Sequence, residues 1–133
     1  MSLSEPAVAT AHKVLLVEDS PDIRAMVAEW LRDEGYDIVE AGDGGAAIRA
    51  LRTHRSPEDL CLVVLDMMLP VADGMAVLRA LADLGGYVPV VAMSADHEQL
   101  MRARTAGATA TLPKPFDLDR LLTVVQHNCG QSA

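Results

Sequence analysis

The run CLVVL at residues 61–65 is the most strand-like stretch of the chain, and it ends at an acidic residue, Asp66. A short and uninterrupted apolar run of this kind is typical of a strand buried on both faces of a parallel sheet. Pro70 and Gly74 then mark a loop before the next helix. The stretch therefore predicts a buried strand that carries a carboxylate at its carboxyl end.

Further strands and helices alternate on both sides of this run. The clearest helix has Ser20 as its N-cap and Pro21 in its first turn. Its apolar residues recur at three- and four-residue spacing, at Ile23, Met26, Val27, Trp30 and Leu31. The other expected strands are Lys13–Glu18, Tyr36–Ala41, Val88–Met93 and Ala108–Leu112. The other expected helices follow Asp43, end near Leu84, span His97–Ala106 and follow Asp117.

This alternation predicts the α/β fold class. Successive parallel strands need a crossover between them, so we expect a doubly wound, five-stranded parallel sheet flanked by five helices. In such folds ligands bind outside the carboxyl ends of the strands. That edge of the sheet is where functional residues should be sought.

Composition limits the function classes that fit. The 133 residues are 50% hydrophobic, which is enough for the core of one domain. Nineteen acidic against 11 basic residues give a formal charge of −8, which disfavours binding to nucleic acids and anionic membranes. With one Trp, two Tyr and one Phe, the chain has few rings on which bases could stack.

The cysteines and the chain ends suggest a cytoplasmic protein. We expect Cys61 to be a buried free thiol, and two cysteines imply no disulfide framework. No apolar run approaches the roughly 18 residues of a membrane span, and residues 1–12 have no leader pattern. We expect a flexible segment over residues 1–12, one domain over residues 13–127 and a short tail over residues 128–133.

Acidic residues gather at the strand ends. Glu18 and Asp19 end the first expected strand, and Asp66 follows the third. These strands are neighbours in a doubly wound sheet, so the three carboxylates should lie close together. Such crowding is unfavourable unless a cation lies among them. Hard oxygen ligands favour Mg²⁺, for which Mn²⁺ can substitute.

A hydroxyl and an ammonium group complete this edge. Ser94 follows the fourth expected strand, and Lys114 follows the fifth. Opposite a metal-bound Asp66, both groups would stabilise a phosphoryl group on that carboxylate. The first strand-to-helix loop lacks the glycines of a nucleotide-binding loop, which argues against nucleotide binding.

Four segments together resemble the receiver domain of two-component response regulators, the CheY-like superfamily, from Lys13 to about Gln126. They are VLLVEDSPDIR, LVVLDMMLPVADG, VVAMSAD and GATATLPKPF. The resemblance implies a flavodoxin-like sheet with strand order 2-1-3-4-5. It also implies a signalling switch rather than an enzyme, in which Asp66 accepts a phosphoryl group from a histidine kinase or a histidine phosphotransfer protein.

The resemblance also implies roles around Asp66. Glu18 and Asp19 match the acidic pair that holds Mg²⁺, with Asp19, Asp66 and the backbone carbonyl of Met68 as direct ligands. Ser94 matches the switch hydroxyl that turns toward the phosphoryl group. An unknown output partner would then bind the changed surface, and the protein would be a monomer or a weak homodimer.

Near the carboxyl end of the domain, Lys114 matches the lysine that pairs with the phosphate, and the Lys114–Pro115 bond is expected to be cis. The chain departs from the family at Thr111, where an aromatic residue is usual three positions before the lysine. This departure puts the usual coupling of site to surface in doubt.

Two alternatives remain open from the residues. A pseudo-receiver would bind partners without phosphorylation, and Thr111 is the residue that favours it. A Mg²⁺-dependent phosphohydrolase with an aspartyl nucleophile would carry an acidic residue two positions after Asp66, where this chain has Met68. Because no general acid stands there, we expect negligible turnover of external phosphoesters.

Overall fold

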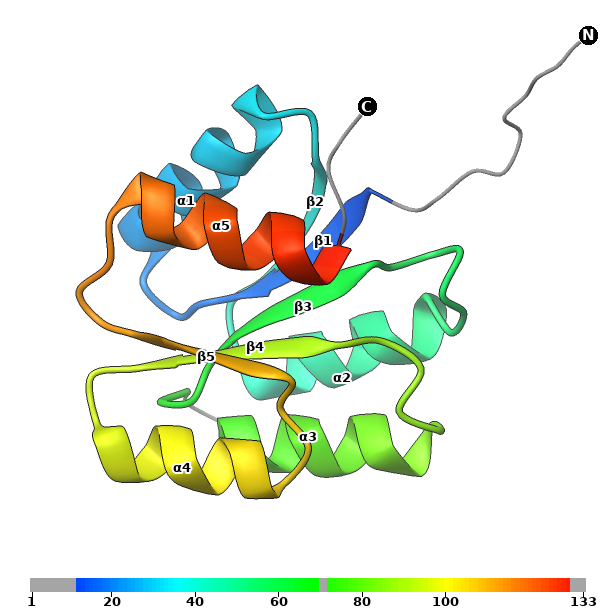
Figure 1. Cartoon of the computed structure of the whole chain (residues 1–133). Helices are drawn as coiled ribbons and strands as arrows, with labels where there is room; N and C mark the ends of the chain where they lie inside the picture. Colours follow the sequence, from blue (N-terminus) through cyan, green and yellow to red (C-terminus); the bar gives the residue numbers. More distant parts are fainter. Residues whose placement is uncertain (1–11, 70–71, 130–133) are drawn as a thin grey trace, which may run out of the picture.

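The computed structural model describes residues 12–69 and 72–129, over which strands and helices alternate (Figure 1). The strands are β1 Lys13–Val17, β2 Asp37–Ala41, β3 Leu62–Asp66, β4 Val90–Ser94 and β5 Ala110–Pro113. The helices are α1 Pro21–Asp33, α2 Gly44–Thr53, α3 Gly74–Asp83, α4 His97–Thr105 and α5 Leu118–Cys129. The strands form one parallel sheet in the order β2-β1-β3-β4-β5, which confirms the predicted doubly wound topology.

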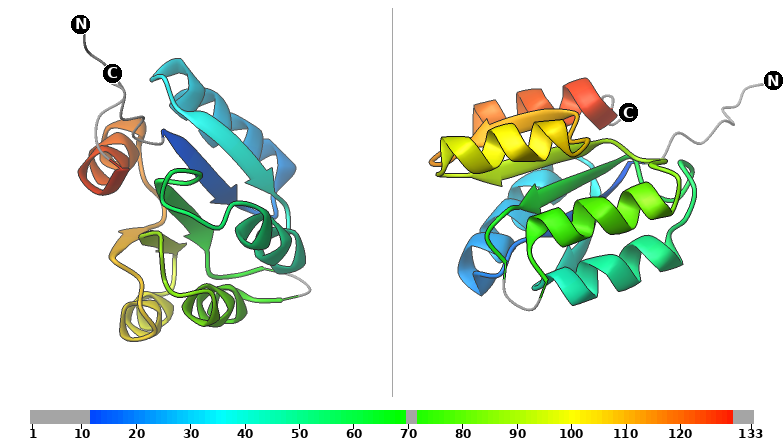
Figure 2. Two further views of the ribbon diagram at one scale, coloured as in Figure 1. Left: turned by 90° about the vertical axis from the view of Figure 1, so that its right-hand side faces the viewer. Right: turned by 90° about the horizontal axis from the view of Figure 1, so that it is seen from below.

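Helices cover both faces of the sheet. Helices α1 and α5 lie on one face, and α2, α3 and α4 lie on the other (Figure 1). The view from below in Figure 2 shows α2, α3 and α4 together on one face of the sheet. Alternate residues of β1 enter the two cores: Val14 and Leu16 pack toward α1 and α5, whereas Leu15 and Val17 pack toward α2, α3 and α4. This two-sided burial explains the uninterrupted apolar runs of the central strands.

The helices begin where the sequence predicts caps. The Ser20 hydroxyl accepts a hydrogen bond from the Ile23 N–H, and Pro21 opens α1. Asp43 caps α2 through the Ala46 N–H at 2.7 Å. The side chain of Asp117 accepts from the Arg120 N–H at the start of α5. These caps satisfy backbone donors that the first helical turn leaves without partners.

The apolar face predicted for α1 is only partly buried. Val27 and Leu31 are buried as expected, but Ile23 and Met26 are 39% and 42% exposed. The two exposed side chains lie in the first turns of α1, close to the carboxyl edge of the sheet. They line an open cleft of about 340 Å³ together with Ala95 and residues 114–116 instead of packing in the core.

The observed limits of β3 and β4 lie closer to the carboxyl edge than the predicted ones, whereas β1 ends at Val17, one residue before the predicted end at Glu18. Strand β3 includes Asp66, which pairs with Met93, and β4 begins at Val90 and includes Ser94. Apolar character set the predicted limits, whereas pairing between strands sets the observed ones. Both polar residues are therefore held by the sheet itself rather than by flexible loops.

The prediction of a free Cys61 thiol is wrong. Cys61 forms a disulfide with Cys129, and their Cα atoms are 5.0 Å apart. Cys61 directly precedes β3, and α5 packs against that strand, so the last residue of the helix reaches it. Helix α5 therefore includes residues 128 and 129, which were expected to belong to the tail. Residues 1–11 and 130–133 lie outside the described residues.

Within the described part of the chain, no helix has the length and apolar character needed to cross a membrane.

Candidate functional site

Three carboxylates meet at the carboxyl edge of the sheet. Glu18 and Asp19 follow β1, and Asp66 is the last residue of the neighbouring strand β3. One oxygen from each carboxylate lies within 4.8 Å of the other two. Glu18 and Asp66 are only 2% and 3% exposed, whereas Asp19 is exposed. The cluster predicted from the sequence is therefore present, with one member open to solvent.

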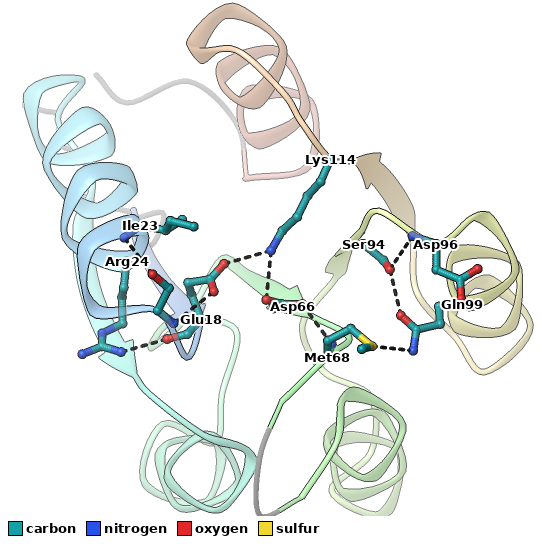
Figure 3. Close-up of polar contacts among 10 residues, drawn as sticks. Glu18, Ile23, Arg24, Asp66, Met68, Ser94, Asp96, Gln99 and Lys114 are labelled. Atoms are coloured by element: carbon teal, nitrogen blue, oxygen red, sulfur yellow. Dashed lines mark hydrogen bonds and ion pairs between the residues drawn. The ribbon is translucent and has the colours of Figure 1, made fainter.

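Lys114 reaches into this cluster from the end of β5 (Figure 3). Its Nζ lies 3.0 Å from Asp66 Oδ2 and 3.2 Å from Glu18 Oε1. The Met68 N–H donates to the other oxygen, Asp66 Oδ1, at 2.9 Å. Both oxygens of the Asp66 carboxylate thus have donors that fix its orientation.

Burial and charge shift the pKa values of two of these groups. Burial raises the pKa of Glu18, and the negative charge of Asp66 adds to this effect, while the Ser20 N–H and Lys114 oppose it. Burial alone would lower the pKa of Lys114. The hydrogen bond to Asp66 and the charges of Asp66 and Glu18 outweigh burial, so the pKa of Lys114 lies above its usual value.

The donor set fits a small divalent cation. Carboxylate oxygens are hard ligands, and Mg²⁺ binds through few of them while it retains several waters. The raised pKa of Glu18 reflects a buried negative charge that a further cation would stabilise. A cleft of about 450 Å³ opens beside the cluster, and its lining includes Asp19, Met68 and Gln99. The cluster is therefore accessible from solvent.

Ser94 ends β4 beside this cluster and is 2% exposed. Its hydroxyl donates to Gln99 Oε1 of α4 at 2.8 Å and accepts from the Asp96 N–H at 2.9 Å. In Figure 3 the hydroxyl contacts α4, whereas Lys114 contacts Asp66 directly. The structure brings the predicted residues to one edge, with Ser94 engaged by α4.

Two residues of this network were missed in the sequence. Arg24 Nη1 donates to the Glu18 carbonyl at 2.8 Å, and its Nε forms an ion pair with Glu40. Gln99 accepts from Ser94. Neither residue stands at a strand end, so the pattern that identified the other residues gives no signal for these two.

A family model for the response regulator receiver domain matches residues 14–126, which is most of the chain. The chain belongs to this family. The receiver domain is a signalling domain rather than a classical enzyme, and its acidic cluster of Glu18, Asp19 and Asp66 fits the magnesium site and the phosphorylated aspartate of the family.

Relatives of this receiver domain include longer regulators and single domains. It is 38% identical over 121 residues to the transcriptional regulatory protein PdtaR of Mycobacterium tuberculosis, covering 89% of this chain and 57% of PdtaR. It is 32% identical to the chemotaxis protein CheY of Bacillus subtilis, covering 86% of this chain and 95% of CheY. The chain spans about half the length of the first regulators that it matches.

A solved relative supports the fold of the receiver domain. The receiver domain of sensor histidine kinase PA1611 from Pseudomonas aeruginosa, solved with a magnesium ion in its active-site cleft, is 30% identical. It superposes with a TM-score of 0.79 and covers 91% of this chain and 99% of that one.

Two further expectations for the receiver domain concern β5 and the residues directly after it. The Lys114–Pro115 peptide bond is cis, as the resemblance implied. Thr111 is half-buried in β5 and pairs with Ala92 of β4, so the position where the family usually has an aromatic ring holds a small side chain.

Proposed function

We propose that this receiver domain is a phosphorylation-controlled switch in which Asp66 is the phospho-acceptor. The observation that carries the proposal is the setting of Asp66. Its carboxylate is buried at a strand end, oriented by Met68 and Lys114, and adjacent to Glu18 and Asp19.

The donor would be the phosphohistidine of a histidine kinase or a histidine phosphotransfer protein. An oxygen of Asp66 attacks the phosphorus atom, a phosphorus–oxygen bond forms, and the phosphorus–nitrogen bond breaks with the imidazole as leaving group. The lysine at position 114 lies within contact distance of Asp66 and would pair with the equatorial oxygens.

The metal site would consist of Glu18, Asp19, Asp66 and the backbone carbonyl of Met68. Mg²⁺, for which Mn²⁺ can substitute, would neutralise negative charge on the phosphoryl oxygens when bound. Within this set, Asp19 is the exposed carboxylate and is suited to direct ligation, whereas Glu18 is buried against Lys114. The magnesium ion in the related PA1611 receiver domain supports the same choice of ion here.

Phosphorylation would act on an output partner through a change of surface. Ser94 would turn toward the phosphoryl group and Lys114 would remain paired with it, which shifts the equilibrium between two conformations of the domain. The partner is unidentified, and the domain would act alone or as part of a longer regulator or hybrid kinase.

Intact-protein mass after incubation with Mg²⁺ and acetyl phosphate tests the acceptor. We expect one added phosphoryl group in the wild type, lost at alkaline pH, and none in Asp66→Asn, which should remain folded. Magnesium-dependent binding of beryllofluoride, followed by Trp30 fluorescence or amide shifts, is the second measurement. Phosphorylation of Asp66→Asn would overturn the assignment of the acceptor. A wild type that is silent in both measurements would favour the pseudo-receiver for which Thr111 argues.

A further inference from the structure

Gln99 joins the end of β4 to the segment after β3 through its side-chain amide. Its Oε1 accepts a hydrogen bond from the Ser94 hydroxyl at 2.8 Å, and its Nε2 lies 3.0 Å from Met68 Sδ (Figure 3). Ser94 ends β4, Met68 follows β3, and Gln99 lies in the first turn of α4. One α4 side chain therefore contacts both Ser94 at the end of β4 and Met68 in the segment that follows β3.

The hydrogen-bonding capacity of Ser94 is largely used by these contacts. A serine hydroxyl has a single proton, and here that proton is donated to Gln99. The oxygen also accepts from the Asp96 N–H at 2.9 Å. For Ser94 to donate to a phosphoryl oxygen on Asp66, it must first release Gln99.

We propose that Gln99 is a positioning residue that holds the Ser94 hydroxyl on α4 in the unphosphorylated domain and couples its release to α4. This inference rests on the proposed function, because it assigns the resting partner of the switch hydroxyl. Phosphorylation of Asp66 then competes with Gln99 for one proton. The amide whose Oε1 loses this hydrogen bond belongs to α4, so the helix receives the signal directly.

The surroundings of α4 favour such a role. Its buried residues are Leu100 and Ala103, while Met101 on the same helix is 55% exposed. A helix with so small an apolar anchor is sensitive to the loss of one polar contact. Thr111 offers no aromatic ring that could transmit the movement of Ser94, so a direct contact between Ser94 and α4 supplies a route.

The Gln99→Leu variant tests the proposal in the full chain. Leucine keeps the approximate size of the side chain but cannot accept from Ser94, so the hydroxyl is free before phosphorylation. We expect beryllofluoride with Mg²⁺ to bind roughly two- to tenfold more tightly, as loss of one competing hydrogen bond predicts. Gln99→Ala should also bind beryllofluoride more tightly than the wild type, and its smaller side chain requires no new packing. Met101→Leu, an exposed change on the same helix, should bind as the wild type does.

Two readouts separate positioning from a general effect on the helix. In a Ser94→Ala background the gain from Gln99→Leu should vanish, because no hydroxyl remains to be released. Without ligand, the amide shifts of Ala95 and Asp96 in Gln99→Leu should move toward their positions in the beryllofluoride-bound wild type.

The outcomes are distinguishable. If the wild type binds beryllofluoride but Gln99→Leu binds equally or more weakly, or if the gain persists in Ser94→Ala, the role of Gln99 is overturned and the proposed function stands. If the wild type neither binds beryllofluoride nor gains a phosphoryl group, the proposed function fails and this inference fails with it.

Discussion

At the scale of single residues, Glu18 links the stability of the domain to pH. Its pKa is raised above the ordinary value of 4.5, first by burial, so the folded state holds this proton more tightly than the unfolded chain does. The group therefore contributes most stability below about pH 4.5. That contribution is lost as the pH rises through the higher pKa of the folded state.

We predict that metal-free Glu18→Gln does not show the loss of stability that ionisation of Glu18 causes in the wild type as the pH rises above 4.5. The free energy of unfolding of the variant should increase relative to that of the wild type as the pH rises from 4.5, measured by urea denaturation in the presence of a chelator. Glu29→Gln, on the exposed side of α1, is the matched control and should follow the wild type. A constant difference between Glu18→Gln and the wild type across this range would contradict the prediction.

Lys114 is the positive charge that contacts both buried carboxylates. In Lys114→Ala, Glu18 and Asp66 would remain buried without this partner. We expect the free energy of unfolding of the metal-free domain to fall by about 1–3 kcal/mol, less than for a fully buried pair because the lysine side chain is 26% exposed.

Millimolar Mg²⁺ should restore part of this stability, since it supplies another cation to the same carboxylates. The variant should still accept a phosphoryl group on Asp66, but with a weaker conformational response. The control is Lys13→Ala, which also removes a lysine charge but at the amino end of β1, on the opposite edge of the sheet from the site. Equal unfolding curves for Lys114→Ala and the wild type without metal would argue against the ion pairs.

At the scale of the elements, the start of α3 is packed tightly against the exit of β3. A Cβ atom added at Gly74 would lie 2.7 Å from Met67 Cα, which is backbone and cannot move without shifting the strand end. We predict that Gly74→Ala lowers the free energy of unfolding by about 1–3 kcal/mol, despite the better helix propensity of alanine.

Gly74→Ala should also weaken binding of beryllofluoride, because Met67 directly follows Asp66. Arg79→Ala, an exposed change on the same helix, is the matched control and should behave as the wild type does. Thermal unfolding and beryllofluoride titration of both variants check the prediction. A neutral Gly74→Ala would show that the exit of β3 is less rigid than this packing implies.

The elements show which features can be predicted from sequence. Caps such as Ser20 and Asp43 depend on a few neighbouring residues, so they could be predicted. The exposure of Ile23 and Met26 could not, because it depends on how far α1 extends beyond the core. The contact between Gln99 and Ser94 depends likewise on how α4 is rotated against β4, and periodicity does not encode that rotation.

At the scale of the whole molecule, strand order creates the site. Glu18 and Asp66 are far apart in sequence, yet β1 and β3 are neighbours, and Lys114 arrives from the last strand. The alternation of strands and helices sufficed to predict the location of the carboxylates, because parallel strands all end at one edge. The pairing of Cys61 with Cys129 could not be predicted, since it depends on where α5 ends over the opposite edge.

The disulfide provides the last prediction. It joins residues 68 positions apart and links the start of β3 to the end of α5, which restricts the unfolded chain. We expect a reducing agent to lower the free energy of unfolding by about 2–4 kcal/mol. The Cys61→Ser, Cys129→Ser double variant should be equally destabilised and insensitive to the reductant.

The same reduction should leave binding of beryllofluoride within about twofold of its value in the oxidised protein, a change well below 1.4 kcal/mol. Cys61 precedes β3 at one end and Asp66 closes the strand at the other, so the bridge and the acceptor are separated by the length of a strand. Thiol titration of the native protein before reduction completes the measurement. Two reactive thiols at that stage, or a large loss of beryllofluoride binding on reduction, would contradict a purely stabilising bridge.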